Sequence, residues 1–263
     1  MKALKNFVKY LARSRSFRFL ADHDAAYLPG VFHRYRWQDI DITYRPGSSD
    51  THLIYNILLK SGRKGEYAAP REWKRDPAEV EVVLDIGANI GISSLYFSSV
   101  YPNARIYAFE PVPENFALLQ ENTRAVGRIT AINAALGREA GELRIFASDL
   151  NTNFGGFSLH ETGTDRGSYQ TVEVRNAQME MERLGIKSAD LIKIDTEGAE
   201  WDILTAFDPR FLAGTQLIMG ELHGHKDFAL LDRLAPDFDI GLRKGIRNRL
   251  FNFYALGRSP SPA

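Results

Sequence analysis

A glycine turn between an apolar run and a helix is the strongest chemical signal in this chain. The run from Glu81 to Leu84 ends in Asp85, and the turn after it reads G-x-x-x-G from Gly87 to Gly91. Glycines at such a turn let the backbone approach a ligand closely. A dinucleotide site would read G-x-G-x-x-G, so the missing third glycine favours a ligand with a ribose but no pyrophosphate.

Acidic or polar residues also stand at the ends of four expected strands. They are Asp85, Glu110, Asp195 with Glu197, and Glu221 with His223. In an open α/β sheet, ligands bind beyond the carboxyl ends of the strands. One such acid could be a helix cap, but four that converge on one edge predict a ligand site. Glu110, at the end of the second strand, is placed to accept hydrogen bonds from both ribose hydroxyls.

An alternation of strands and helices begins at residue 80 and indicates a parallel sheet that is covered on both faces. Strands are expected at 80–85, 104–110, 128–133, 190–195 and 215–222. Helices are expected at 90–100, 113–126, 177–185, 199–206 and 225–235. Two further pairs of strands are expected, 143–146 with 170–174 around a polar loop, and 237–242 with 250–256 as an antiparallel edge.

Residues 1–75 are predicted to be an extension that caps a core domain of residues 76–263. The expected elements of the extension are an amphipathic helix at 2–13, short β-type runs at 30–46 and a helix at 51–60. The first helix carries basic residues opposite its apolar stripe. It is expected to dock on its own domain, and the alternative is a weak contact with an anionic membrane surface.

Composition narrows the class of function. Lys and Arg number 33 and Asp and Glu number 33, so the net charge is zero, which argues against a nucleic-acid-binding protein. There is no cysteine, which excludes disulfides, zinc–thiolate sites and a cysteine nucleophile. No apolar run approaches the ~20 residues of a membrane span, and the basic N-terminus makes a poor signal peptide. A cytoplasmic protein is therefore expected.

Three stretches resemble the FkbM family of S-adenosylmethionine-dependent methyltransferases. They read VVLDIGANIG, FEPVPENFALLQEN and LIKIDTEGAEWDIL, and the earlier stretch YRPGSSDTHLIYNILLKSGRKGEY resembles the family's segment before the core. The resemblance covers residues 40–222. It implies an α/β, class I (Rossmann-like) methyltransferase fold, whose seven-stranded sheet is mostly parallel with an antiparallel last strand. It further implies S-adenosylmethionine as cofactor and methyl transfer to a hydroxyl on a sugar, glycan or natural-product scaffold.

The resemblance also assigns cofactor-binding positions. They are Asp85, Gly87, Ala88, Asn89, Gly91, Glu110, Asn133, Ala134 and Tyr67. Asn133 and Ala134 follow the third strand, where adenine rests in such folds. Asp85 would hold the amino group of the methionine moiety through nearby backbone or water, and Tyr67 would cover the methionine end.

Methyl transfer to a hydroxyl needs an aligned acceptor and a base within hydrogen-bond reach. The candidates for the base are Asp195 and His223, with Glu197 and Glu221 orienting the acceptor. His223 and the pair Asp195 and Glu197 could also have purely structural roles. His223 would then be a satisfied edge histidine, and Asp195 and Glu197 would cap the helix that begins near Ala199.

A divalent metal ion is a further alternative, which is not favoured. Its oxygen and nitrogen ligands would come from Asp195, Glu197, Glu200, Asp202, His223 and His225. Glu200 and Asp202, however, are expected to turn away on a helix face, and the family resemblance requires no metal.

Other functions stay open. An amine acceptor would be attracted by the acid-rich pocket, so N-methylation is an alternative to O-methylation. A nucleic-acid methyltransferase is disfavoured because Asp195 to Gly198 offers no aromatic face to stack a flipped base. A non-catalytic nucleotide-binding module would bind the cofactor without turnover. The sequence does not set the identity of the small-molecule or glycan acceptor, or the oligomeric state.

Overall fold

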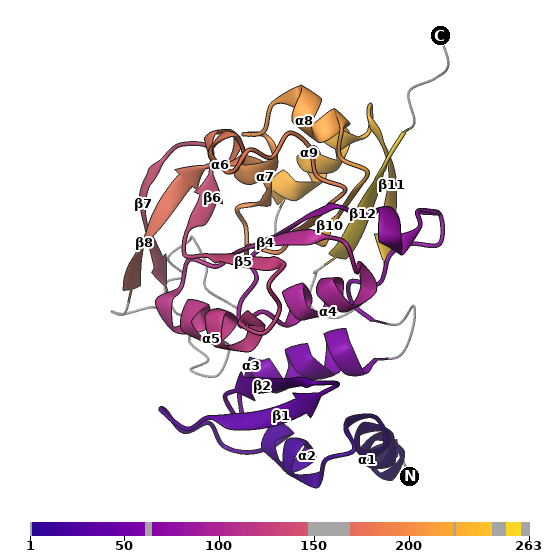
Figure 1. The fold of residues 1–263 in the computed structure, drawn as a ribbon, viewed down its shortest axis with the longest axis vertical. Helices are drawn as coiled ribbons and strands as arrows, with labels where there is room; N and C mark the ends of the chain where they lie inside the picture. Colours follow the sequence, from indigo (N-terminus) through magenta and orange to yellow (C-terminus); the bar gives the residue numbers. More distant parts are fainter. Residues whose placement is uncertain (1, 61–64, 147–168, 223–224, 244–250, 259–263) are drawn as a thin grey trace.

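A mostly parallel sheet lies at the centre of the computed structural model (Figure 1). The structure describes residues 2–60, 65–146, 169–222, 225–243 and 251–258. The strands of the sheet are β3 (Val82–Ile86), β4 (Arg105–Phe109), β5 (Ile129–Ile132), β9 (Leu191–Ile194), β10 (Leu217–Leu222), β11 (Phe238–Arg243) and β12 (Phe251–Gly257). Within these residues the sheet has seven strands in the order β11-β12-β10-β9-β3-β4-β5.

The direction of the strands confirms the fold expected from the sequence. The strands from β5 to β10 pair in parallel, and β12 pairs antiparallel with both β10 and β11. The pair near the C-terminus is therefore antiparallel, as expected. Its last strand, however, lies inside the sheet, and β11 forms the edge and runs with the parallel strands.

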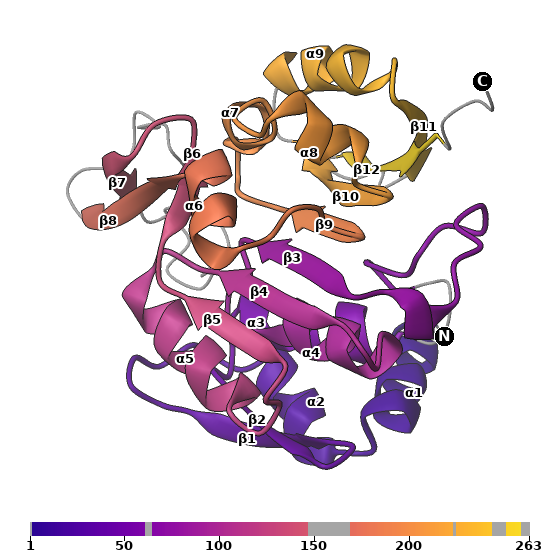
Figure 2. The ribbon, with the colours of Figure 1, turned by 45° about the horizontal axis from the view of Figure 1, so that its top comes forward.

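Helices cover both faces of this sheet (Figure 2). One face carries α6 (Ala177–Leu184), α7 (Glu200–Leu204), α8 (Pro209–Ala213) and α9 (His225–Leu234); the other carries α4 (Ile92–Val100) and α5 (Pro113–Thr123). Strand β3 shows why both layers form, because all of its residues are buried. Val82, Leu84 and Ile86 pack toward α6–α9, whereas Val83 packs toward α4.

A second, smaller sheet stands beside the main one (Figure 2). It consists of β6 (Ala135–Gly137), β7 (Gly141–Phe146) and β8 (Tyr169–Asn176), and among the described residues its order is β6-β8-β7. Strands β7 and β8 are the pair expected from the sequence, and they run antiparallel. Strand β6 was not expected, since three residues are too few to show an alternating pattern.

The N-terminal extension packs beneath α4 and α5 (Figure 1). Its elements are α1 (Lys2–Ser14), α2 (Phe17–His23), β1 (His33–Trp37), β2 (Ile40–Tyr44), α3 (Ser49–Leu53) and the π-helix η1 (Ile54–Leu59), followed by the short 3₁₀ helix η3 (Pro77–Glu79) before β3. The helix expected at 51–60 is thus two pieces, because the backbone changes from α to π pairing after Leu53.

Buried polar contacts attach the extension to α5. Thr43 N donates to Asn122 Oδ1 at 2.7 Å, and Asn122 Nδ2 donates back to Thr43 O at 3.1 Å. Arg45 forms a buried ion pair with Asp50 at 2.8 Å and donates from Nη2 to Asn115 Oδ1 at 2.9 Å. One apolar cluster also runs from the extension into the main sheet. The division at residue 75 stays a prediction.

The C-terminal half of α1 docks on the extension itself. The ring of Tyr10 stacks on Tyr55 with centroids 3.7 Å apart, and Arg13 Nη1 donates to Tyr55 Oη at 3.1 Å. Val8, two residues before Tyr10, is exposed. Contact of this helix with a membrane surface stays a prediction. Among the described residues, no helix combines the length and apolar character that crossing a bilayer requires.

Candidate functional site

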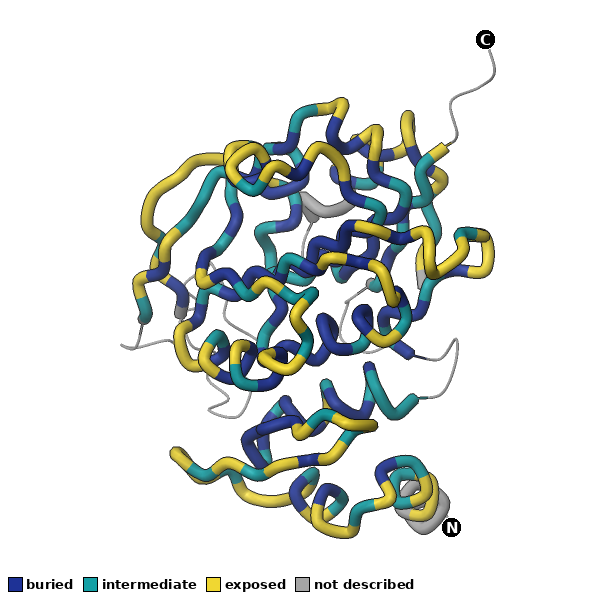
Figure 3. The backbone as a smooth tube through the Cα atoms, in the orientation of Figure 1, coloured by how far each residue is buried: buried dark blue, intermediate teal, exposed yellow. Residues whose placement is uncertain are grey.

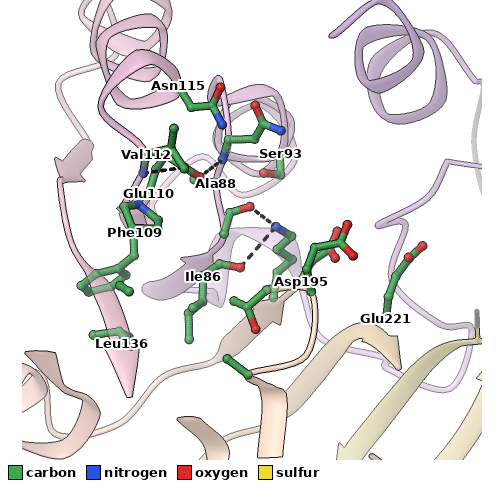
Figure 4. A pocket seen from close by; sticks show the side chains of 18 of the residues that line it. Ile86, Ala88, Ser93, Phe109, Glu110, Val112, Asn115, Leu136, Asp195 and Glu221 are labelled. Atoms are coloured by element: carbon green, nitrogen blue, oxygen red, sulfur yellow. Dashed lines mark hydrogen bonds between the residues drawn. The ribbon is translucent and has the colours of Figure 1, made fainter. Parts of the chain in front are cut away.

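A cavity of about 260 Å³ opens at the carboxyl ends of β3, β4, β9 and β10. Its walls come from the main sheet, from the small sheet and from the N-terminal extension. In Figure 4, Phe109, Glu110 and Leu136 lie at one side of the cavity, and Asp195 and Glu221 lie at the other. The four strand ends at which the sequence placed acidic residues therefore surround one cavity.

An apolar wall lines the part of the cavity near the small sheet. Leu136, Leu143 and Ile145 contribute to it from β6 and β7, and Ala199 and Ile203 contribute from the N-cap and the body of α7. A surface of this kind can bury a planar ring without leaving a polar side chain unpaired. The small sheet thus supplies binding surface that the sequence motifs alone did not indicate.

The glycine turn forms the floor of the cavity. Gly87 has a φ of +78°, and a Cβ added there would overlap the carbonyl oxygen of Asp195 at the neighbouring strand end. Ala88 and Asn89 follow it and also line the cavity. Gly91, with a φ of +88°, instead faces α5, where a Cβ would lie 2.8 Å from Leu119 Cδ1. The first glycine therefore serves the cavity and the second serves helix packing.

Glu110 holds the turn from the end of β4. Its Oε2 accepts from Asn89 N and its Oε1 accepts from Val112 N, both at 2.9 Å. The residue is 5% exposed and lines the cavity. Burial raises the pKa of Glu110 to about 7, against the lowering effect of the hydrogen bonds from Val112, Asn89 and Asn115. These three hydrogen bonds use three of the roughly four lone pairs of the carboxylate, and the remaining one can accept from a ligand hydroxyl.

Asp85 lies behind the cavity wall and is fully buried. Its Oδ2 accepts from the hydroxyls of Ser93 and Ser94, each at 2.6 Å, and its Oδ1 lies 3.3 Å from Lys193 Nζ. Ser93 and Lys193 line the cavity, whereas Asp85 does not. Any influence of Asp85 on a ligand is therefore transmitted by these two neighbours.

Lys193 is a site residue that the sequence analysis missed. Its Nζ donates to Gly87 O at 2.6 Å, so the buried cation holds the glycine turn from below. Burial alone would lower the pKa of Lys193, but Asp85 and Asp195 outweigh burial and raise it. The signal in the sequence was a lysine inside the apolar strand LIKI. Its partner became evident only when the sheet register placed Lys193 opposite Asp85.

Three carboxylates gather at the opposite side of the cavity, from Glu66, Asp195 and Glu221. The hydroxyl of the buried Tyr67 donates to Asp195 Oδ2 at 2.8 Å. Burial, followed by the charges of Asp195 and Glu66, raises the pKa of Tyr67 well above its usual value, so the phenol stays a neutral donor. Lys193 Nζ lies 5.3 Å from the centre of the Tyr67 ring. This side of the cavity suits a positively charged ligand group.

The loop after β9 corrects one expectation. Glu200 does not turn away from the site, because it is fully buried and its carboxylate accepts from Thr196 N at 2.9 Å and from Gly198 N at 3.0 Å. The free amides before a helix attract a carboxylate, and this contact fixes the loop that carries Glu197. Asp202 is exposed on α7, as expected.

The expected site residues divide into three groups. Those that line the cavity are Gly87, Ala88, Asn89, Glu110, Ala134, Tyr67, Asp195, Glu197 and Glu221. Those that do not are Asp85, Gly91 and Asn133, and Asn133 Nδ2 donates instead to Glu110 O at 2.9 Å and to Pro111 O at 3.0 Å. His223 lies outside the described residues. Within the described part of the chain, no three His, Asp or Glu side chains gather as a metal site.

Comparison with known proteins identifies the family of this chain. The model of the methyltransferase FkbM domain matches residues 85–242. "Methyltransferase 1" of Beauveria bassiana is 31% identical over 144 residues, which cover 48% of this chain and 58% of that protein. "Hexuronic acid methyltransferase AglP" of Haloferax volcanii is 27% identical, over 62% of this chain and 65% of that protein. The chain thus spans less than two thirds of the length of both relatives.

Two further likenesses complete the comparison. "2-O-methyltransferase NoeI" of Sinorhizobium fredii is 27% identical, over 64% of this chain and 74% of that protein. Among solved structures, M. capricolum TrmK in complex with S-adenosyl-homocysteine is 9% identical, with a TM-score of 0.42 over 72% of this chain and 69% of that chain. This structural overlap is weak, and the strand order and the family match define the fold.

Proposed function

Because this chain belongs to the FkbM methyltransferase family, we propose that it transfers a methyl group from S-adenosylmethionine to a hydroxyl oxygen of a sugar, glycan or natural product. The observation that carries the proposal is the position of Glu110. Its carboxylate is held over the glycine turn, in a cavity whose opposite side is acidic. This arrangement suits a nucleoside without phosphates that carries a positive charge.

The residues fit S-adenosylmethionine in each part of the cavity. That cofactor supplies a methyl group on a positively charged sulfur. Glu110 can accept a hydrogen bond from the ribose hydroxyls, and the apolar wall around Leu136 and Ile145 can bury the adenine. The turn at Gly87 brings backbone against the ligand, where a side chain would collide with Asp195. The carboxylates of Asp195 and Glu221 stabilise a nearby positive charge.

The protein's task in such a transfer is to align the acceptor, exclude water and remove a proton. Tyr67 covers the cavity from the extension and fixes Asp195 by its hydrogen bond. Glu197 lies on a loop that Glu200 holds in place. The acceptor is thus received between the end of β9 and the extension, where these residues line the cavity.

A hydroxyl acceptor is favoured by the relatives. The name of one relative describes a hexuronic acid methyltransferase, and the name of another describes a 2-O-methyltransferase. An amine is the second candidate, because the carboxylates of Glu66, Asp195 and Glu221 would attract an ammonium group. The carbon chemical shift of the transferred methyl group in the isolated product separates the two.

The proposal is tested with S-adenosylmethionine that carries a deuterated methyl group. Purified protein is incubated with small-molecule and glycan fractions of a cell extract, and the products are analysed by mass spectrometry. A product that gains the labelled methyl group with the wild type, and gains less of it with Glu110→Ala at limiting cofactor, is expected. If the wild type binds the cofactor and labels nothing in any fraction, the proposed enzyme is instead a binding module.

Glu110→Ala should weaken the binding of S-adenosylmethionine by about 1–3 kcal/mol, because the ribose hydroxyls lose their acceptor. Isothermal titration calorimetry measures the change. The matched control is Glu114→Ala, which removes an exposed acid four residues further along the chain that does not line the cavity. Equal affinities of the wild type and Glu110→Ala would contradict the ribose assignment.

The affinity for an uncharged nucleoside should fall as the pH drops below about 7, the value to which burial raises the pKa of Glu110. Below that pH the free protein holds Glu110 protonated, and binding must first expel the proton. The loss approaches about tenfold per pH unit. Calorimetry with 5′-methylthioadenosine measures it, since this ligand has a ribose but no charged sulfur. Glu110→Gln should abolish the pH dependence, and a dependence that survives would exclude Glu110 as its source.

A further inference from the structure

We propose that Glu66, on the segment between the π-helix η1 and β3, is the general base that takes the proton from the acceptor hydroxyl. This inference rests on the proposed function and deepens it. Glu66 comes from the N-terminal extension, outside the residues that the family model matches.

The position of Glu66 is fixed by its neighbours. Its backbone N donates to Asn56 O at 3.4 Å, and Tyr67, the next residue, is buried and bonded to Asp195. Glu66 lines the cavity together with Asp195 and Glu221. The extension therefore places this carboxyl on the same side of the cavity as the two acidic strand ends.

The three acids of this side differ in their partners. Asp195 accepts from the Tyr67 hydroxyl at 2.8 Å, and Glu221 accepts from Asn252 Nδ2 at 3.0 Å. Within the described part of the chain, the carboxylate of Glu66 accepts no hydrogen bond. A base must offer a lone pair to the proton that it removes, and no donor among the described residues occupies the lone pairs of the Glu66 carboxylate.

The charges around Glu66 suit it to this role. Burial raises the pKa of Glu66 to about 7, the negative charges of Asp195 and Glu221 add to the rise, and Lys60 and Lys193 oppose it. A carboxylate whose pKa lies near neutral pH is a far better proton acceptor than an ordinary glutamate, yet it is still largely ionised at slightly alkaline pH.

Methyl transfer to the hydroxyl is then a single displacement at the methyl carbon. The acceptor oxygen forms a bond to the methyl carbon while the bond between that carbon and the sulfur breaks. The electron pair of the broken bond stays on the sulfur, which becomes a neutral thioether. The hydroxyl proton moves to the Glu66 carboxylate, which becomes a neutral carboxylic acid and later releases the proton to solvent.

A first experiment needs no acceptor. A carboxyl that faces the acceptor also faces the charged sulfur, so S-adenosylmethionine should expel the Glu66 proton more completely than neutral S-adenosylhomocysteine does. Calorimetry near pH 7, in two buffers of different ionisation enthalpy, counts the protons released with each ligand. The wild type should release more with S-adenosylmethionine, and Glu66→Gln should abolish the difference. A difference that persists in Glu66→Gln overturns the proposal.

Turnover provides the second readout. With the acceptor found by labelling, Glu66→Gln should lower kcat by about 10²–10⁴-fold and leave KM for the acceptor nearly unchanged, and Glu66→Asp should recover part of the rate. The acidic limb of the kcat profile near pH 7 should disappear in Glu66→Gln. In Glu221→Gln the limb should move to lower pH, because a neighbouring negative charge is removed.

Two controls separate this role from the others. Glu72→Gln removes an exposed acid of the same segment and should behave as the wild type. Glu66→Gln should fold at least as stably as the wild type above pH 7, since it removes a charge that burial disfavours. A Glu66→Gln variant that keeps the wild-type kcat overturns the proposal and assigns the base to Asp195 or His223. A wild type that labels no acceptor overturns the proposed function, and the role of Glu66 falls with it.

Discussion

Lys193→Met should lower the free energy of unfolding by about 3–5 kcal/mol, because it leaves a buried carboxylate without its cation. Asp85 is fully buried, and after the substitution only the hydroxyls of Ser93 and Ser94 would stabilise its charge. The turn would also lose the hydrogen bond from Nζ to Gly87 O. Urea denaturation measures the change, and binding of S-adenosylmethionine should weaken with it.

A second substitution tests this explanation. Lys193→Met combined with Asp85→Asn should recover part of the lost stability, because the unpaired charge is gone and the amide oxygen still accepts from a serine hydroxyl. Lys187→Met, which changes an exposed lysine in the loop before β9, is the matched control and should stay close to the wild type. If Lys193→Met unfolds at the wild-type urea concentration, the buried pair contributes nothing to stability.

Gly87→Ala should have an effect of similar size. The φ of +78° is strained for alanine, and the new methyl group would overlap the carbonyl oxygen of Asp195. Backbone strain and overpacking together cost about 2–6 kcal/mol, which the protein can reduce only by separating the ends of β3 and β9. That movement shifts both the turn and Asp195, so S-adenosylmethionine binding should be lost along with stability.

The control for this variant is Gly127→Ala, at the loop after α5. A Cβ at Gly127 meets no atom within 4 Å, and the backbone there lies outside the left-handed region. This variant should match the wild type in thermal unfolding and in calorimetry. If Gly87→Ala also bound the cofactor with wild-type affinity, the close approach of the two strand ends would not be needed for the site.

The sheet could be predicted from the sequence because its strands are short apolar runs with clear ends. Val82–Ile86 is buried at every position and stops at a glycine turn, so the sequence predicts both the length of this strand and the turn that follows it. Other features depend on tertiary structure. The π-helix at Ile54–Leu59 has the composition of an ordinary helix, and the three residues of β6 form a strand only because β8 pairs with them.

The candidate site was predictable to a similar extent. Gly87 and Glu110 belong to local patterns, so their places in the cavity followed from the chain alone. Lys193 and Glu66 lie in stretches that resemble the family, but nothing in their local sequence marked them as site residues. Lys193 required the register of β3 against β9, and Glu66 required a segment between η1 and β3 to be folded over the cavity. Glu200 was misjudged because its contact is with amides of the preceding loop.

The cavity wall supplied by the extension has a consequence for how such proteins diversify. The family model matches residues 85–242, whereas Ser49, Glu66 and Tyr67 lie upstream of that match and still border the same space. We expect natural variation upstream of the matched residues to alter which molecule is methylated while the methyl donor stays the same. Grafting another relative's upstream segment onto this chain would have to preserve the contacts of Thr43 and Arg45 with α5, or the hybrid would lose the wall that it was built to exchange.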